Sequence, residues 1–171
     1  TNNCEPRPVE CECEGGVFPL DPGDFGRYLA IDARDGLVVV SSYSDRFGDL
    51  VVSTLDEQGD VVPEAVDGIP DRNPSFDPEG YRGGISRNGD KVGTWTSSVI
   101  AADGTVAVSY VSEENGALRF AQGTPGDWTV HEVQSNEAVS EDAWTFHTDI
   151  QLGPGDVPEI AFMVTNLPDA N

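Results

Sequence analysis

The sequence contains very few cations. Its 171 residues include nine Lys and Arg against 31 Asp and Glu, which gives a formal net charge of −22, and Lys91 is the only lysine. A surface this acidic repels the phosphates of nucleic acids and the headgroups of anionic lipids, so both classes of partner are disfavoured. Basic partners, divalent cations and a salty medium stay compatible, and the plainest interpretation of the charge is a solubilising surface.

Long apolar runs are missing as well. None approaches the roughly 20 residues that a membrane-spanning helix needs. No stretch combines apolar residues at helical spacing with capping residues, so no helix is predicted. The hydrophobic fraction of 37% is nevertheless enough for a folded core, and the length predicts one domain.

Cysteine is absent after residue 13. Cys4, Cys11 and Cys13 lie in residues 1–24, a Pro-, Gly- and Glu-rich segment that we expect to be an irregular arm. Their spacing matches no zinc, haem or thioredoxin-type motif, and the neighbouring glutamates argue against a reactive thiolate. In an oxidising compartment Cys4 would pair with Cys11 or Cys13, since those two are poor partners for each other. The third thiol suggests a disulfide to another chain. We prefer the simpler interpretation, in which one local disulfide staples the arm.

From residue 25 the sequence consists of short β-type runs separated by turns. "YLAID" and "LVVVSSY" flank the turn "ARDG", and "DLVVSTLD" and "VVPEAV" follow. Asp-Gly between such runs is a hairpin signal, so these segments predict four strands. Residues 67–90 then form a polar insertion, of a length that is usually functional or mobile. Within it Tyr81 and Arg82 are the best candidate binding residues, because aromatic and arginine side chains are typical interface anchors.

The strand pattern repeats. "DGLVVVSSYSDRFGDLVVS" (residues 35–53) returns as "DGTVAVSYVSEENGALRFA" (residues 103–121), with 12 residues from Gly36 to Gly48 and again from Gly104 to Gly116. A third copy, "AWTFHTDIQLGPGDVPEIAFMV", has Phe162 in the tyrosine position. A four-stranded unit of about 45–50 residues has the period of a β-propeller blade. The predicted fold is all-β: residues 25–171 form about three blades, the last one incomplete and completed by another chain or a missing segment.

One stretch carries a family resemblance. "VGTWTSSVIAADGTVAVSYVSEENGALRFA" resembles the blade repeat of exported propeller proteins of myxobacteria and their relatives, G-x-[WY]-T-S…D-G…V-x-Y…G-x-L-x-[FY]-A. The resemblance covers residues 24–171, is closest in the second copy, and extends to the insertion "VDGIPDRNPSFDPEGYRGGI". It implies the propeller fold and a secreted or cell-surface location, and it implies no activity. The related Asp-box of sialidases is not satisfied, because "TPGDWT" has no aspartate two residues after its first threonine.

The third copy stops early. Residues 166–171 align with the loop "SEENG" of the second copy. Three blades, one of them unfinished, cannot close into a ring, and exposed loop tips are preferred sites of proteolysis. We therefore expect the N-terminal product of a precursor that is cut at Asn171 and stays paired with its C-terminal half. Two alternatives remain: the other strands are unfolded or lie outside this sequence, or the chain is a self-sufficient β-sandwich.

Residues with catalytic or metal-binding chemistry are sparse. In "HTD", His147 and Asp149 would share one face of a regular strand, where the carboxylate orients the imidazole or both ligate a metal. Polar residues facing a propeller channel are the simpler interpretation. No serine lies in a nucleophile elbow. The Asp- and Gly-rich turns suit a structural Ca²⁺, although none matches the EF-hand pattern, and no other cofactor is expected.

These observations favour a non-catalytic interaction protein that is exported and binds a protein or a glycan. The alternative is a propeller hydrolase or lyase for a carbohydrate-type substrate, with acids in a central channel that is shared with the missing half. Acids that converge from several blades with shifted pKa values would favour the enzyme.

Overall fold

The computed structural model describes residues 23–55, 58–69, 89–135 and 143–166, which form antiparallel β-sheets and no helix. The first sheet contains β1 (Phe25–Arg34), β2 (Leu37–Ser44), β3 (Leu50–Leu55) and β4 (Val61–Asp67) in chain order. The second contains β5 (Val92–Ile100), β6 (Val106–Ser112), β7 (Leu118–Thr124) and β8 (Asp127–Gln134). The third pairs β9 (Ala143–Leu152) with β10 (Pro158–Asn166). The predicted all-β class is confirmed.

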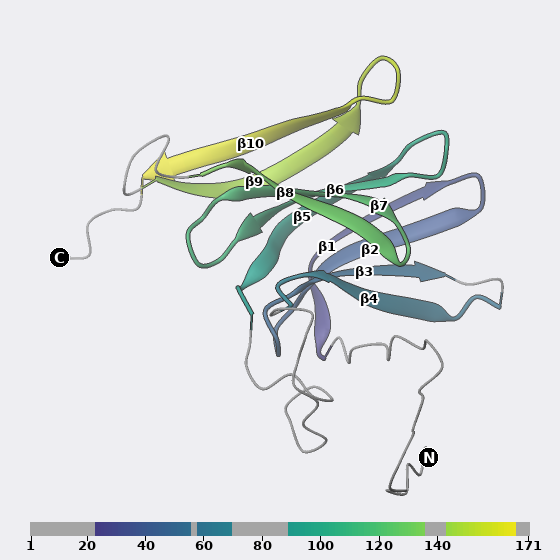
Figure 1. The fold of residues 1–171 in the computed structure, drawn as a ribbon, viewed down its shortest axis with the longest axis horizontal. Helices are drawn as coiled ribbons and strands as arrows, with labels where there is room; N and C mark the ends of the chain where they lie inside the picture. Colours follow the sequence, from purple (N-terminus) through teal and green to yellow (C-terminus); the bar gives the residue numbers. More distant parts are fainter. Residues whose placement is uncertain (1–22, 56–57, 70–88, 136–142, 167–171) are drawn as a thin grey trace, which may run out of the picture.

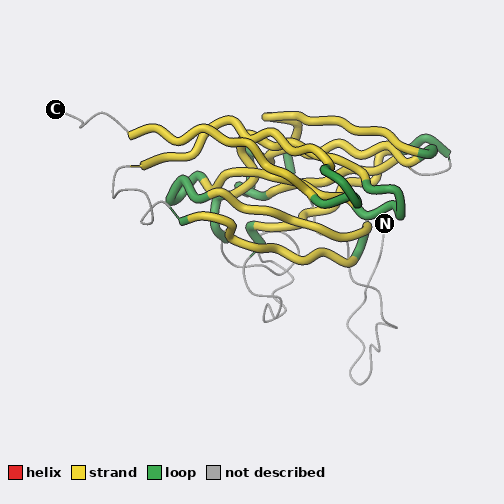
Figure 2. Tube along the Cα trace, turned by 90° about the horizontal axis from the view of Figure 1, so that it is seen from above, coloured by secondary structure: helices red, strands yellow, loops and turns green. Residues whose placement is uncertain are grey.

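The three sheets are stacked in chain order. Figure 1 shows β1–β4 at the bottom, β5–β8 in the middle and the β9–β10 pair on top, and Figure 2 shows strands joined by short loops. Each sheet is open, since its strands follow in sequence from one edge to the other. The stacking brings together residues from different repeats, which matters for the site described below.

The turn residues account for the hairpins. Asp35 and Gly36 both have positive φ, at 50° and 90°, as the two central residues of the tightest hairpin turn require. In the Asp-Gly pair of the second repeat only Gly104 has a positive φ, at 86°. There the amide of Ala101 donates to the carbonyl of Thr105 across a wider turn. Identical Asp-Gly pairs therefore close two different hairpins.

The G-x-L loops are alike in both complete sheets. The amide of Gly48 donates to the carbonyl of Ser44, and that of Gly116 to the carbonyl of Ser112, each at 2.8 Å. Positive φ values of 82° and 64° suit these glycines to the turn. Each glycine also contacts the next sheet through its own carbonyl, which accepts from Val92 at 2.7 Å or from Thr145 at 3.1 Å.

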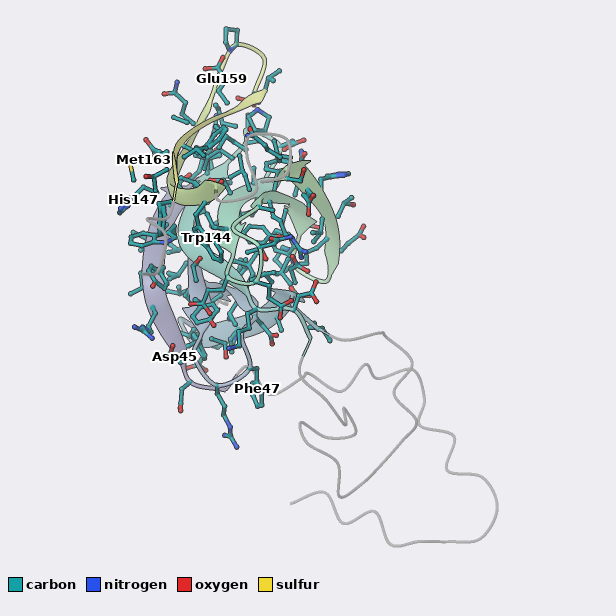
Figure 3. The ribbon with its side chains drawn as sticks, turned by 90° about the vertical axis from the view of Figure 1, so that its left-hand side faces the viewer. Asp45, Phe47, Trp144, His147, Glu159 and Met163 are labelled. Carbon is teal, nitrogen blue, oxygen red and sulfur yellow. The ribbon has the colours of Figure 1, made fainter. Side chains whose placement is uncertain are left out.

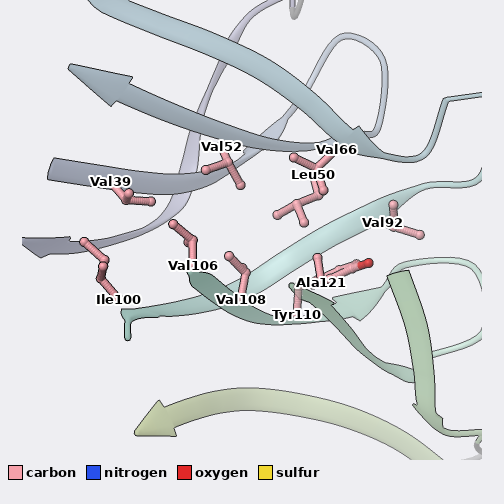
Figure 4. Packing of buried hydrophobic residues seen from close by; sticks show 10 residues of the cluster. All are labelled: Val39, Leu50, Val52, Val66, Val92, Ile100, Val106, Val108, Tyr110 and Ala121. Carbon is pink, nitrogen blue, oxygen red and sulfur yellow. The ribbon is translucent and has the colours of Figure 1, made fainter. Parts of the chain in front are cut away.

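The hydrophobic core lies between the first and second sheets. Val39, Leu50 and Val52 contribute from the first sheet, and Val106 and Val108 contribute from the second, all at most 2% exposed. Figure 4 shows the two sets of side chains facing each other. Burial of this apolar surface is the main force that holds the sheets together.

The packing relation between sheets repeats. β5 contacts β1 and β2 of the first sheet, and β9 contacts β5 and β6 of the second. The third sheet thus lies on the second as the second lies on the first. Phe162 lies at the bulge of its sheet, as Tyr110 does in the second sheet. Tyr43, predicted to share this position, is instead the equivalent of Val111.

Apolar side chains stay exposed on strands of the first and third sheets. On β1, Leu29 and Ile31 are 61% and 70% exposed, and on β10, Phe162 and Met163 are 37% and 48% exposed. Exposed apolar side chains of this size suggest surfaces that pack against further protein.

Several predicted features lie outside the described residues. The arm with Cys4, Cys11 and Cys13 is one, and Asn171 is another. Of the insertion 67–90, the structure describes only the two ends, so Tyr81 and Arg82 are not among the described residues either.

Candidate functional site: a row of rings across three sheets

The first strand of every sheet contains a bulky residue in a left-handed conformation. The φ angles are 54° at Tyr28 in β1, 55° at Trp95 in β5 and 49° at His147 in β9. All three residues lie where the strand pairing shifts register. A positive φ is rare for large side chains, since it brings Cβ too close to the backbone. The bulge is thus a feature of the repeat, present three times.

The three rings contact one another in a row. The ring centroids are 4.8 Å apart for Tyr28 and Trp95 and 4.0 Å apart for Trp95 and His147, with tilted planes. Phe146 meets the edge of Trp95 at 6.1 Å. Tyr28 and Trp95 are half-buried and His147 is exposed. The row therefore forms a continuous aromatic surface that crosses all three sheets.

A repeated hydrogen bond holds the row in place. The Oγ1 of Thr96 donates to the carbonyl of Tyr28, and the Oγ1 of Thr148 donates to the carbonyl of Trp95 at 2.7 Å. Each threonine directly follows the ring residue of its own strand and reaches the ring residue of the preceding sheet. These bonds fix the spacing of the strands and hence of the rings.

The two ends of the row differ in charge. At the first end, Arg27 lies over the Tyr28 ring, 5.8 Å from its centroid, and its Nη1 is 2.6 Å from Asp45 Oδ1. The hydrogen bond and the charge of Asp45 raise the pKa of Arg27. At the other end, Asp149 accepts a hydrogen bond from Ser97 Oγ at 3.2 Å. A cation with its carboxylate thus lies at one end and an exposed carboxylate at the other.

The prediction for His147 and Asp149 needs correction in its premise. It assumed a regular strand, but His147 lies in the bulge opposite Phe162 and Met163 and has a φ of 49°. Its ring contacts Trp95, whereas Asp149 bonds to Ser97. In Figure 3, His147 and Met163 project from the same side of the molecule. Across the described ranges, no group of three or more His, Cys, Asp or Glu side chains is arranged to hold a metal ion.

A second polar cluster joins the two ends of the insertion to β6 and β7. Asp67 Oδ2 accepts from the hydroxyl of Tyr110 at 2.7 Å and pairs with Arg119 at 3.0 Å. Arg119 also reaches Asp90 at 3.3 Å. Burial lowers the pKa of Arg119, but Asp67 more than offsets this and the pKa is raised. The cluster therefore links Asp67 and Asp90, the first and last residues of the insertion, through Arg119.

Sequence reasoning did not identify the row, although part of its signal is visible. Tyr28 and Trp95 each follow a glycine by two residues, in "GRY" and "GTW". The third copy has no glycine there, so His147 is not recognisable as the equivalent residue. Only the contacts between sheets show that the three belong together.

Two buried tyrosines predict a loss of stability at alkaline pH. Burial, and then the acceptors Glu113 and Asp67, raise the pKa values of Tyr43 and Tyr110. The pKa of each tyrosine is higher in the folded than in the unfolded protein. Its contribution to the free energy of unfolding is therefore full below about pH 10, the unfolded pKa, and is lost as the pH rises towards the folded pKa. Tyrosinate absorbance should show both groups ionising only together with the loss of the β-type circular dichroism. Full ionisation of a native chain would contradict this.

Comparisons with known proteins identify no family. No family model matches the chain, and no curated protein matches it. The resemblance to exported propeller proteins therefore stays a prediction from the residues quoted above. In the part of the chain that the structure describes, no helix is long and apolar enough to cross a membrane.

Proposed function

We propose that this chain forms three successive blades of a β-propeller and that its function is non-catalytic binding outside the cell. β1–β4 and β5–β8 are the first two blades, and β9 and β10 are the first two strands of the third. The repeated contact of the first strands carries this proposal: β5 lies on β1 and β2 as β9 lies on β5 and β6. Blades meet in this way because each packs its faces against two neighbours.

The open edge of β10 is evidence for pairing with a further strand from a partner. In both complete sheets a third strand pairs with the second, Leu50 opposite Tyr43 and Leu118 opposite Val111. Among the described strands β10 pairs only with β9, and an open strand edge is a template for pairing. We propose that the C-terminal half of the same precursor supplies a strand that begins Gly-x-Leu and covers Phe162.

The carboxylates between the sheets support binding over the hydrolase or lyase alternative. A general acid or nucleophile must reach a substrate. Three acids near the sheet contacts instead accept structural hydrogen bonds from the neighbouring sheet. The pairs are Asp67 with Tyr110 and Arg119, Glu64 with Trp128, and Glu113 with Tyr43.

Photocrosslinking tests the proposal on protein purified from cells that express the whole gene. A photoreactive benzoylphenylalanine replaces Phe162 on β10 or, as a control, Val133, which is 52% exposed on β8. We expect native mass spectrometry to show a second polypeptide, crosslinked from position 162 to a strand that follows Gly-x-Leu, and no such crosslink from position 133.

Two other outcomes are informative. A crosslink within one uncut polypeptide would keep the propeller and reject the cut at Asn171. A monomeric chain that unfolds cooperatively, without a crosslink from position 162, would reject the propeller in favour of a β-sandwich.

A further inference from the structure

The row of Tyr28, Trp95 and His147 has the properties of a binding surface. Its rings contact one another from three sheets, and exposure increases towards His147. The row lies wholly within this chain. The inference below names a partner class and so rests on the proposed binding function, but it does not need the strand that completes β10.

The backbone is strained at each of the three ring residues, Tyr28, Trp95 and His147. A left-handed conformation at a bulky residue costs free energy, on the order of 1–3 kcal/mol, and such residues cluster at functional sites. The rings are not the sole contact between the sheets, since a core joins the first two sheets and the bonds from Thr96 and Thr148 join the first strands of all three. The repeated strain therefore points to a use for the rings themselves.

The structure contains an example of what these rings accept. The guanidinium of Arg27 lies over the Tyr28 ring and pairs with Asp45. Aromatic faces attract cations, and tryptophan attracts them most strongly. At the other end of the row, Trp95 and His147 lie next to Ser97 and Asp149 in β5 and β9. Two rings and the exposed carboxylate of Asp149 thus lie at nearby positions of the same two strands.

We propose that Trp95, His147 and Asp149 bind an arginine side chain of a basic partner peptide. The guanidinium lies over the two rings and pairs with the carboxylate of Asp149, which the hydrogen bond from Ser97 Oγ orients. The net charge of −22 attracts such a peptide from a distance and disfavours anionic ones. A basic peptide is therefore the class of partner that both the charge and the rings select.

Fluorescence anisotropy with a labelled arginine–glycine peptide tests this on the whole protein at physiological salt. The matched probe is the same peptide with citrulline, which keeps the shape of arginine without its charge. We expect Trp95→Leu and His147→Leu to weaken binding about fivefold or more, and Asp149→Asn to weaken it as well. The citrulline peptide should not bind at the same concentrations.

Matched controls separate the row from general electrostatics. His131 and Asp127 lie exposed on β8, so His131→Leu and Asp127→Asn should change affinity less than twofold. His147 is exposed, so its variant stays informative if Trp95→Leu fails to fold. Equal losses at Asp127 and Asp149 without an effect at His147 would overturn the proposal, as would binding of a neutral oligosaccharide in place of the peptide. Failure of this test leaves the crosslink at Phe162 unaffected.

Discussion

Replacing Gly93 with alanine should destabilise the protein by about 2–5 kcal/mol, from backbone strain and overpacking together. Gly93 has a φ of 108°, and a Cβ built on it would lie 2.7 Å from the Cα of Leu50. Both obstacles are backbone features, so no rotamer change relieves them. Equilibrium unfolding in urea measures the effect as a lower midpoint.

Gly26 is the matched control, because it occupies the same place in the first repeat. Its φ is 120°, yet a Cβ there meets nothing within 4 Å among the residues that the structure describes. Gly26→Ala should therefore carry only the conformational cost of about 1–2 kcal/mol. Equal destabilisation by the two substitutions would show that β5 does not approach Leu50 so closely.

Replacing Asp67 with alanine should cost about 1–3 kcal/mol, as expected when an acceptor shared by two largely buried donors is removed. The side chains of Asp67 and Arg119 are only 17% and 16% exposed. The substitution leaves the guanidinium and the hydroxyl of Tyr110 without this shared acceptor. Urea unfolding should show a much lower midpoint. Proteolysis within the insertion should also be faster, since Asp67 holds one of its ends.

Two further variants test that explanation. Adding Arg119→Met to Asp67→Ala should restore part of the loss, because the guanidinium that has lost Asp67 is removed with it. Asp45→Ala breaks the exposed pair with Arg27, whose side chains are 46% and 62% exposed, and should leave the urea midpoint close to that of the unchanged protein. A double variant no more stable than Asp67→Ala would contradict a role for the buried charge.

The local elements of this fold are predictable because their causes are local. The first eight strands follow from β-branched runs between turn residues, and Gly48 and Gly116 form the same loop because "SDRFG" and "SEENG" end in the same way. The equivalence of Phe162 with Tyr110 is visible in the repeat as well, but the predicted equivalence of Tyr43 with Tyr110 is wrong, because Leu50 pairs with Tyr43 whereas Leu118 pairs with Val111. Such features need only the preferences of neighbouring residues for φ, ψ and burial.

The local rules failed where the backbone leaves its regular pattern. The strand around His147 was expected to be regular, but it contains a bulge opposite Phe162 and Met163. The identical Asp-Gly pairs at Gly36 and Gly104 close different turns. A bulge or a turn type depends on pairing and packing as well as on sequence, so a pattern of two residues does not specify it.

The all-β class, the positions of the strands and the repeat follow from the sequence alone, since hydrophobic alternation and turn residues act over a few positions. Which residues of different repeats come into contact depends on the packing of the sheets. Thr96 reaches Tyr28 across 68 residues, and Arg119 reaches Asp67 across 52. These contacts arise because buried apolar faces stack the sheets, and stacking brings equivalent positions of successive repeats side by side. The aromatic row is a product of that stacking.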